Sequence, residues 1–322
     1  MSTDRGGLFR LLRRDGDPSS RLRSRLGAAL AAIVALAGFA ATSGAAPPLR
    51  QATIAEADRA WSRRAEGAEG ERAAPGPVGE AIAAYEAVLA AQPENLEAIW
   101  KLQRALHFQG EFTRLSAAKR ARLWERGTEL AERAVAVLHR GDPTWHERDP
   151  AAAAKRIEDR TLGAAVHFWA AVHWGLWGET KGALPAVRKG VAKRIREHAL
   201  LAVVLDETYE RAGPHRLLGR LHAVAPRVPL LTGWVDRDQA VRHLERAVEL
   251  APDEVWNRLY LAEARLEHRP GERARAIADL EAVVAAQPDS EHGLEDRRAQ
   301  RAARALLDAD ETRETAGSAP LR

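Results

Sequence analysis

The chain has 322 residues, of which 46% are hydrophobic and 29% charged, a composition typical of a folded protein. It contains no cysteine, which excludes disulfides, thiolate metal sites, thiol catalysis and acylation at a cysteine. The net charge of +4 arises in residues 1–25, where seven arginines outnumber three aspartates by four. The other residues therefore sum to zero, which argues against a nucleic-acid-binding surface on the folded part.

The first predicted elements are a basic cytoplasmic segment at residues 1–25 and a membrane-targeting segment at residues 26–46. The second stretch is apolar, uncharged and long enough to cross a bilayer as a helix. The arginines before it are expected to stay in the cytoplasm, so the folded part would lie on the periplasmic side. Ser43, Gly44 and Ala45 resemble a signal-peptidase site, so both an uncleaved membrane anchor and a cleaved signal peptide stay open.

Residues 51–310 are predicted to form a domain of helical hairpins. One pattern recurs at residues 81–93, 240–252 and 276–288: alanine, then tyrosine or leucine at +4, glutamate at +5 and proline at +12. The alanine and the large residue lie one turn apart on one helix face, and the proline ends the helix. A helix–turn–helix unit with these offsets resembles the tetratricopeptide repeat (TPR). We expect an all-α fold, an α-solenoid of TPR-like repeats, with a disordered tail at residues 311–322.

The middle of the chain, residues 160–235, is Trp-rich and is expected to be irregular and helical. It holds an aromatic segment at 167–178, a Gly-Pro-His turn at 213–215, and a loop at 233–240 that leads into the second repeat copy. In this order, the three features resemble the TRAP transporter T-component family over residues 80–310. The resemblance implies a periplasmic or membrane-facing accessory that binds a solute-binding protein, with a homo-oligomer and a pore or groove as further expectations. Members of that family are often lipoproteins, and this chain has no cysteine to acylate.

The first candidate ligand-binding residues are Trp169, His173 and Trp177, which are spaced four apart and form a stripe on one predicted helix. The stripe either lines an apolar pocket for a small organic ligand or packs in the core. His215 and Arg216 are the second candidates, because Pro214 would place them in the first turn of a helix. Free amides, an arginine and the helix dipole there favour a small organic anion; the alternative is a helix start with an exposed histidine.

No chemistry beyond binding is indicated by the sequence. The histidines at 167 and 173, and at 215 and 222, lack the spacing of four that places two imidazoles on one metal. No phosphate loop, dinucleotide fingerprint or nucleophile elbow occurs, so neither a cofactor nor an enzyme is expected. We predict a TPR-like accessory of a TRAP-type solute transporter, which binds a periplasmic protein partner and a small organic anion. The alternative is a TPR scaffold for a membrane-associated assembly, without a ligand.

Overall fold

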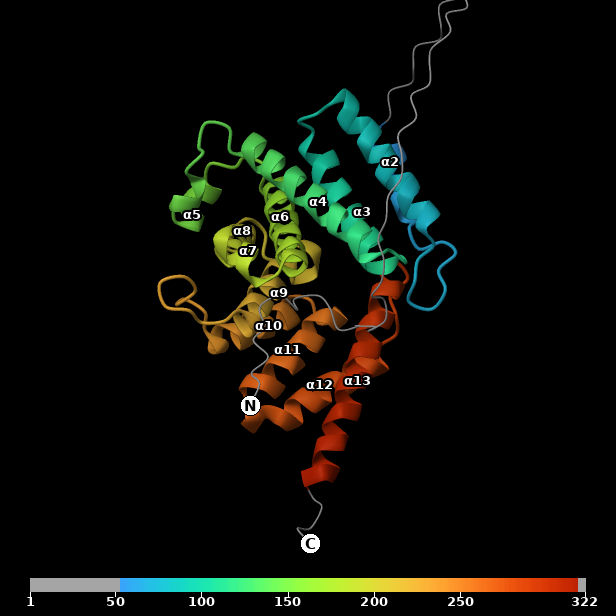
Figure 1. The fold of residues 1–322 in the computed structure, drawn as a ribbon, viewed down its shortest axis with the longest axis vertical. Coiled ribbons are helices and arrows are strands. Elements are labelled where there is room, and N and C mark those ends of the chain that lie inside the picture. The colour runs from blue at the N-terminus through green and yellow to red at the C-terminus, as the bar shows by residue number, and fades with distance from the viewer. Residues whose placement is uncertain (1–52, 318–322) are drawn as a thin grey trace, which may run out of the picture.

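The computed structural model describes residues 53–317, and these residues form 13 α-helices and no β-strand (Figure 1). Their bounds are α1 (Ile54–Ser62), α2 (Pro75–Ala91), α3 (Leu96–Phe112), α4 (Ala117–Leu138), α5 (Pro150–Ala154), α6 (Arg160–Lys181), α7 (Ala183–Arg188), α8 (Val191–Leu205), α9 (Tyr209–Val224), α10 (Arg237–Leu250), α11 (Val255–His268), α12 (Arg273–Ala285) and α13 (Gly293–Gly317). Short 3₁₀ turns lie at Trp145–Glu147 and Pro270–Glu272. The expected all-α class is confirmed.

The recurring pattern corresponds to helical hairpins, as the sequence predicts. The hairpins are α2 with α3, α10 with α11 and α12 with α13, and in each pair the two helices pack on one another. The alanine and the large residue at +4 are fully buried in every copy, as in Ala81 and Tyr85. The prolines lie in the connections, where their rings do not disturb a helix. The assignment of these hairpins to the TPR class stays a prediction.

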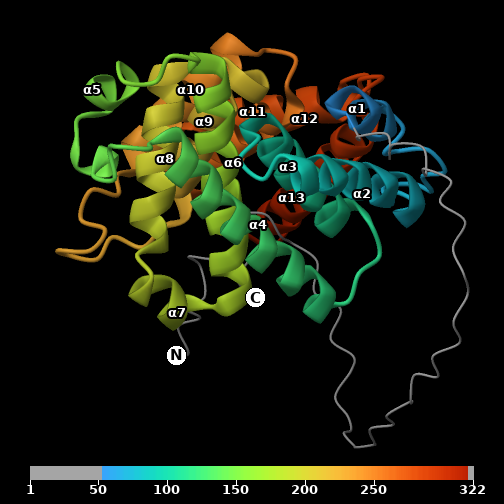
Figure 2. The ribbon, with the colours of Figure 1, turned by 90° about the horizontal axis from the view of Figure 1, so that it is seen from above.

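Helix α6 forms the centre of the molecule. It packs against α3, α4, α8 and α9, so its aromatic and alanine side chains are buried on nearly every side. Close approach to α4 is possible because Gly127 has no side chain: a Cβ there would lie 1.9 Å from Nδ1 of His173. The Trp-rich section therefore serves as the axis around which the other helices are arranged (Figure 2).

The last described helix returns to the first ones, as Figure 1 shows on its right-hand side. Leu294 of α13 belongs to the same hydrophobic cluster as residues of α1, α2 and α3. Arg298 donates from Nη1 to Oε2 of Glu111 at 3.1 Å, and Arg64 donates to the backbone oxygen of Glu291 at 2.5 Å. An open solenoid would show contacts only between neighbouring repeats. Here the start of α13 contacts α1 and α3, and a central space lies between these helices.

Several predicted segments lie outside the described residues, namely 1–25, 26–46 and the end of the expected tail. Within residues 53–317, no helix combines the length and apolar character that a membrane crossing requires. Helix α13 continues to Gly317, past residue 311 where the disordered tail was expected to begin. The turns of α13 before this point are rich in alanine and arginine, which favour a helix, and the helix continues from them.

Candidate functional site

A cavity of about 220 Å³ lies at the centre of the arrangement. Its wall is formed by α1, α3, α6, α9, α11 and the start of α13, which are distant in sequence and brought together by the closure of the chain. The lining combines aromatic side chains with six arginines and five glutamates. The arginines are Arg64, Arg104, Arg211, Arg216, Arg220 and Arg298. Such a space suits a small ligand with an apolar body and a charged group.

Aromatic rings hold several of these arginines in place. Trp61 has a guanidinium on each of two sides, because the Cζ atoms of Arg64 and Arg104 lie 4.5 and 4.3 Å from its ring centroid. Arg298 lies 4.1 Å from the ring of Phe112 in the same way. A guanidinium over an aromatic face gains cation–π attraction and loses little freedom on meeting an anion. The cavity wall therefore carries pre-positioned positive charge.

Several cavity arginines have a buried Nε–H group without a hydrogen-bond partner. Among the described residues, the Nε atoms of Arg64, Arg104 and Arg298 are buried without a hydrogen-bond partner. Arg64 is only 3% exposed, and its Nη2 donates to the backbone oxygen of Glu291. A buried donor without a partner costs free energy, and this cost is recovered when a ligand supplies an acceptor. These Nε–H groups are therefore available to a hydrogen-bond acceptor.

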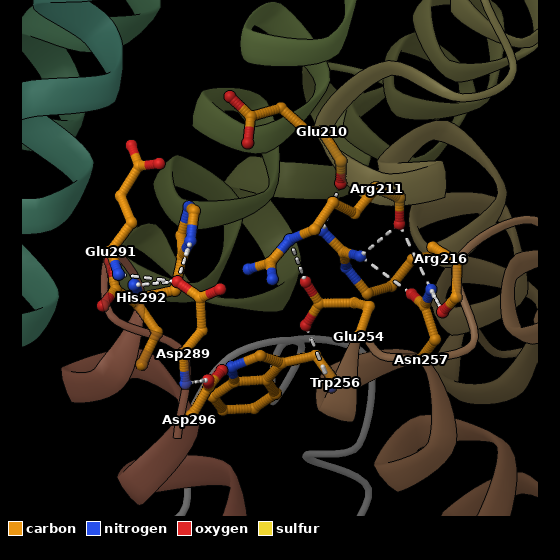
Figure 3. A network of polar contacts seen from close by, with 12 residues as sticks. Glu210, Arg211, Arg216, Glu254, Trp256, Asn257, Asp289, Glu291, His292 and Asp296 are labelled. Atoms are coloured by element: carbon orange, nitrogen blue, oxygen red, sulfur yellow. Dashed lines mark hydrogen bonds and ion pairs between the residues drawn. The ribbon is translucent and has the colours of Figure 1, made fainter. Parts of the chain in front are cut away.

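The opposite wall contains a strained turn at the start of α9. Glu210, Arg211 and Ala212 have φ values of 47°, 54° and 61°, which is left-handed backbone that non-glycine residues rarely adopt. Arg216 holds this turn by donating to the backbone oxygens of Glu210 and Arg211 at 3.3 and 3.2 Å. Asn257 donates from Nδ2 to the same oxygen of Arg211 at 3.2 Å (Figure 3). Strain of this kind gathers at functional sites.

An ion pair fixes the side chain of Arg211, the middle residue of the strained turn. Nε of Arg211 lies 2.7 Å from Oε2 of Glu254, whose side chain is only 3% exposed. Glu254 also caps α11, because its Oε1 accepts from the backbone nitrogen of Trp256 at 3.1 Å. Across the cavity, Asp289 accepts from the backbone nitrogens of Glu291 and His292 (Figure 3). The positive charge of Arg211 is thus compensated by Glu254. By contrast, Arg64 and Arg104 beside Trp61 each keep a buried Nε–H group without a hydrogen-bond partner.

The structure brings two of the five predicted ligand-binding residues to the cavity, Trp169 and Arg216. Trp169 is 5% exposed and donates its indole hydrogen to Oη of Tyr209 at 3.1 Å. Arg216 lines the wall, but its Nη1 is also bound to Oδ1 of Asn257 at 2.8 Å. Its contacts are therefore mainly with the protein, and it supports the strained turn.

The other three predicted residues lie elsewhere. His173 is fully buried between α3 and α4, and its Nε2 is 3.0 Å from the backbone oxygen of Gln103. Trp177 packs on Trp174 with ring centroids 5.8 Å apart, on the side of α6 that faces α7 and α8. His215 faces α10, with its Nδ1 2.9 Å from Nδ1 of His243. The stripe is split because positions four apart on a helix diverge by about 40° per step.

His107 is an uncharged polar group in the same wall. Burial lowers its pKa to about 3, and the nearby Arg298 and Arg216 act in the same direction. It is therefore neutral near pH 7 and offers a hydrogen-bonding ring beside Trp169, with ring centroids 5.6 Å apart. Among residues 53–317, no group of three or more imidazole or carboxylate side chains is arranged to hold a metal ion.

Sequence reasoning missed the main cationic residues of the cavity. Arg64 lies in the turn after α1, Arg104 on α3 and Arg298 on α13, and no local motif connects them. Two of them share one signal, an arginine within four residues of a tryptophan, as in Trp61 and Arg64 or Trp100 and Arg104, whereas Arg298 has no aromatic residue that close in the sequence. This signal is weak in a chain with 49 basic residues. Only the closure of the fold places these residues in one wall.

Comparison with known proteins supplies the family. No curated protein matches this chain. The family model described as TRAP transporter T-component matches residues 82–312, which include α3 to α12 and most of α13. The match covers well over half of the sequence. It includes the aromatic segment, the Gly-Pro-His turn and the loop at 233–240, which occur in this order in the middle of the chain. The chain therefore belongs to the TRAP transporter T-component family.

Proposed function

We propose that this protein is a membrane-anchored or exported accessory of a TRAP-type solute transporter that holds a small organic anion in its central cavity and binds a periplasmic solute-binding protein. Family membership supports the accessory role and a membrane-associated or periplasmic location. The observation that carries the ligand is the group of buried arginine Nε donors without partners beside Trp61 and Phe112. The aromatic lining favours an apolar body on the anion.

The ligand proposal is tested by calorimetry on the full chain with four probes: benzoate, hexanoate and their neutral amides. The carboxylates should bind and the amides should not, because only a negative charge is attracted by the surplus donors. Arg104→Gln should weaken carboxylate binding at least tenfold, since it removes a guanidinium that lies on Trp61. Arg133→Gln on the exposed face of α4 is the matched control. Equal binding of acids and amides would contradict the anion assignment.

Trp169 and Trp177 provide a second, internally controlled comparison on one helix. Trp169→Phe should reduce carboxylate affinity, because Trp169 lines the cavity, whereas Trp177→Phe should not. Both variants must keep the helical circular dichroism and melting temperature of the parent. The scaffold alternative predicts that no probe binds and that neither variant changes the association with a partner protein.

The partner proposal is tested by co-purification with the solute-binding protein of the same transporter. The complex should form with the parent chain and with Arg133→Gln. If large assembly proteins associate instead, with equal yield from every variant, the scaffold function replaces the transporter function.

A further inference from the structure

The exposed apolar side chains of the described chain are concentrated in two short segments. Five large hydrophobic residues are exposed in residues 53–311, and all five lie either on α7 or in the loop between α9 and α10. They are Leu184, Val187, Val228, Leu230 and Leu231. Leu230 is fully exposed, with a relative accessibility of 103%. Scattered exposed hydrophobics are ordinary, but such a concentration marks an interaction surface.

One hydrophobic cluster connects α7 with the two ends of the loop. Ala186 of α7 belongs to this cluster together with Ala225 and Val235, which flank the loop. In Figure 2 the loop projects from the left edge of the molecule and α7 lies at its lower left. We refer to α7 and the loop at residues 226–233 together as the apolar edge.

The loop of the apolar edge is braced by its own hydrogen bonds. Oγ1 of Thr232 accepts from the backbone nitrogen of Val228 at 2.9 Å and donates to the backbone oxygen of Pro226 at 2.5 Å. Arg227 donates from Nε to the backbone oxygen of Gly233 at 3.2 Å, which closes the base of the loop. Leu230 has a left-handed φ of 65°, an uncommon conformation for a leucine. The loop thus projects its leucines in a fixed arrangement.

Basic residues lie on and next to α7, although Lys181 and Lys193 are paired with Glu125 and Glu197. Residues 181–196 contain six basic residues and no acidic one, namely Lys181, Arg188, Lys189, Lys193, Arg194 and Arg196. Arg188 and Lys189 are exposed on α7 and just after it, and Arg227 adds a further exposed cation at the loop. The folded part has a net charge of zero, so this cationic surface is local.

We propose that the apolar edge docks on an anionic lipid surface, with Leu230 and Leu231 entering the interface and Arg188 and Lys189 contacting lipid phosphates. Protruding leucines ringed by lysine and arginine fit a bilayer, in which apolar burial and attraction to anionic headgroups act together. Leu230 and Leu231 are 103% and 57% exposed, so their side chains are free to enter a lipid interface. This contact is independent of the cavity ligand and would orient the domain at the membrane.

The test uses the absence of cysteine from the chain, because one introduced cysteine can be labelled alone. Pro229→Cys carries an environment-sensitive dye beside the two leucines, in the full chain mixed with vesicles of phosphatidylcholine with or without phosphatidylglycerol. The dye emission should shift to shorter wavelength with the anionic vesicles. Ser290→Cys, in the exposed turn before α13, is the matched label and should not respond.

Two sets of variants in the Pro229→Cys background separate the two forces. Leu230→Ser with Leu231→Ser should abolish the shift, and Arg188→Glu with Lys189→Glu should reduce it several-fold on anionic vesicles. The proposal is overturned if the labels at 229 and 290 respond equally, or if the shift is the same without phosphatidylglycerol. A shift that needs no vesicles and grows with protein concentration would also overturn it and assign the edge to a second copy of the chain.

Discussion

At the scale of single residues, the contact between α4 and α6 depends on Gly127. A Cβ at this position would lie 1.9 Å from Nδ1 of His173, which is itself fully buried. Gly127→Ala should therefore lower the free energy of unfolding by about 1–3 kcal/mol, the usual cost of overpacking. Urea denaturation followed by circular dichroism measures this change.

The control for this substitution is Gly79→Ala in α2, where an added Cβ meets no heavy atom within 4 Å. There, alanine should stabilise the protein by about 0.5–1 kcal/mol, because it is the better helix former. If the two substitutions have the same effect, α4 and α6 do not approach each other as described.

Two of the five ligand-binding residues predicted from the sequence line the cavity. Trp169 and Arg216 lie in its wall because their own helices, α6 and α9, face the centre. His173, Trp177 and His215 lie on the same two helices as Trp169 and Arg216. The direction in which each side chain points depends on which neighbouring helix covers that face. The direction of each side chain is set by packing between helices that are distant in the sequence, so the spacing of residues along one helix does not predict it.

At the scale of elements, a line of buried histidines joins three helices. Nε2 of His139 at the end of α4 is 2.9 Å from Nε2 of His167 on α6. The other ring nitrogen of His167, Nδ1, is 2.8 Å from Nδ1 of His198 on α8. Each contact needs one ring to donate and the other to accept, so neutral imidazoles satisfy the line in either direction.

Burial keeps this line neutral and makes the fold sensitive to acid. It lowers the pKa of His139 to about 4 and that of His198 to about 3, and it also lowers the pKa of His167. Asp142 partly opposes the shift at His139, and Arg194 adds to the shift at His198. The unfolded chain takes up protons below about pH 6.5 while the folded chain does not. Stability is therefore full above about pH 6.5 and falls as the pH decreases toward 4.

We predict that the loss of unfolding free energy between pH 7.5 and 5.5 is smaller in His198→Gln than in the parent. The difference should be about 1 kcal/mol, the share of one histidine that is protonated only when unfolded. Denaturant titrations at the two pH values measure it. His146→Gln, an exposed histidine near the same helices, should leave the loss unchanged. An unchanged loss in His198→Gln would mean that the line of histidines does not cause the acid sensitivity.

The elements themselves were largely predictable, since an alanine, a large residue and a proline at fixed offsets define each hairpin. The strained start of α9 was not, because the left-handed turn at residues 210–212 exists only where Arg216 and Asn257 bind its carbonyl oxygens. Asn257 lies 41 residues away from Arg216 and contributes through α11. A local propensity argument finds only the Gly213-Pro214 signal and places a simple helix start there.

At the scale of the whole molecule, the return of α13 to α3 decides how the protein unfolds. Glu111 and Arg298 are separated by 187 residues, and their side chains are 10% and 16% exposed. The same contact encloses the cavity, because Arg298 also lies on the ring of Phe112. In an open solenoid, terminal repeats unfold with little effect on distant ones. With the ends joined, loss of this pair should destabilise the complete array in one transition.

A double-mutant cycle between Glu111→Gln and Arg298→Gln tests the closure. Each single variant removes the contact between the two side chains and leaves a charge in a poorly solvated place, so the two changes should be non-additive, with a coupling energy of about 1–3 kcal/mol. The matched pair is Glu94 and Arg140, which are 61% and 67% exposed and whose coupling should stay within about 0–1 kcal/mol. All variants should unfold in a single transition with the parent's slope against urea. A second transition in Arg298→Gln alone would show that α13 unfolds separately from the other helices. The cavity wall that α13 contributes, including the side chain at position 298, could then open and close when a ligand binds.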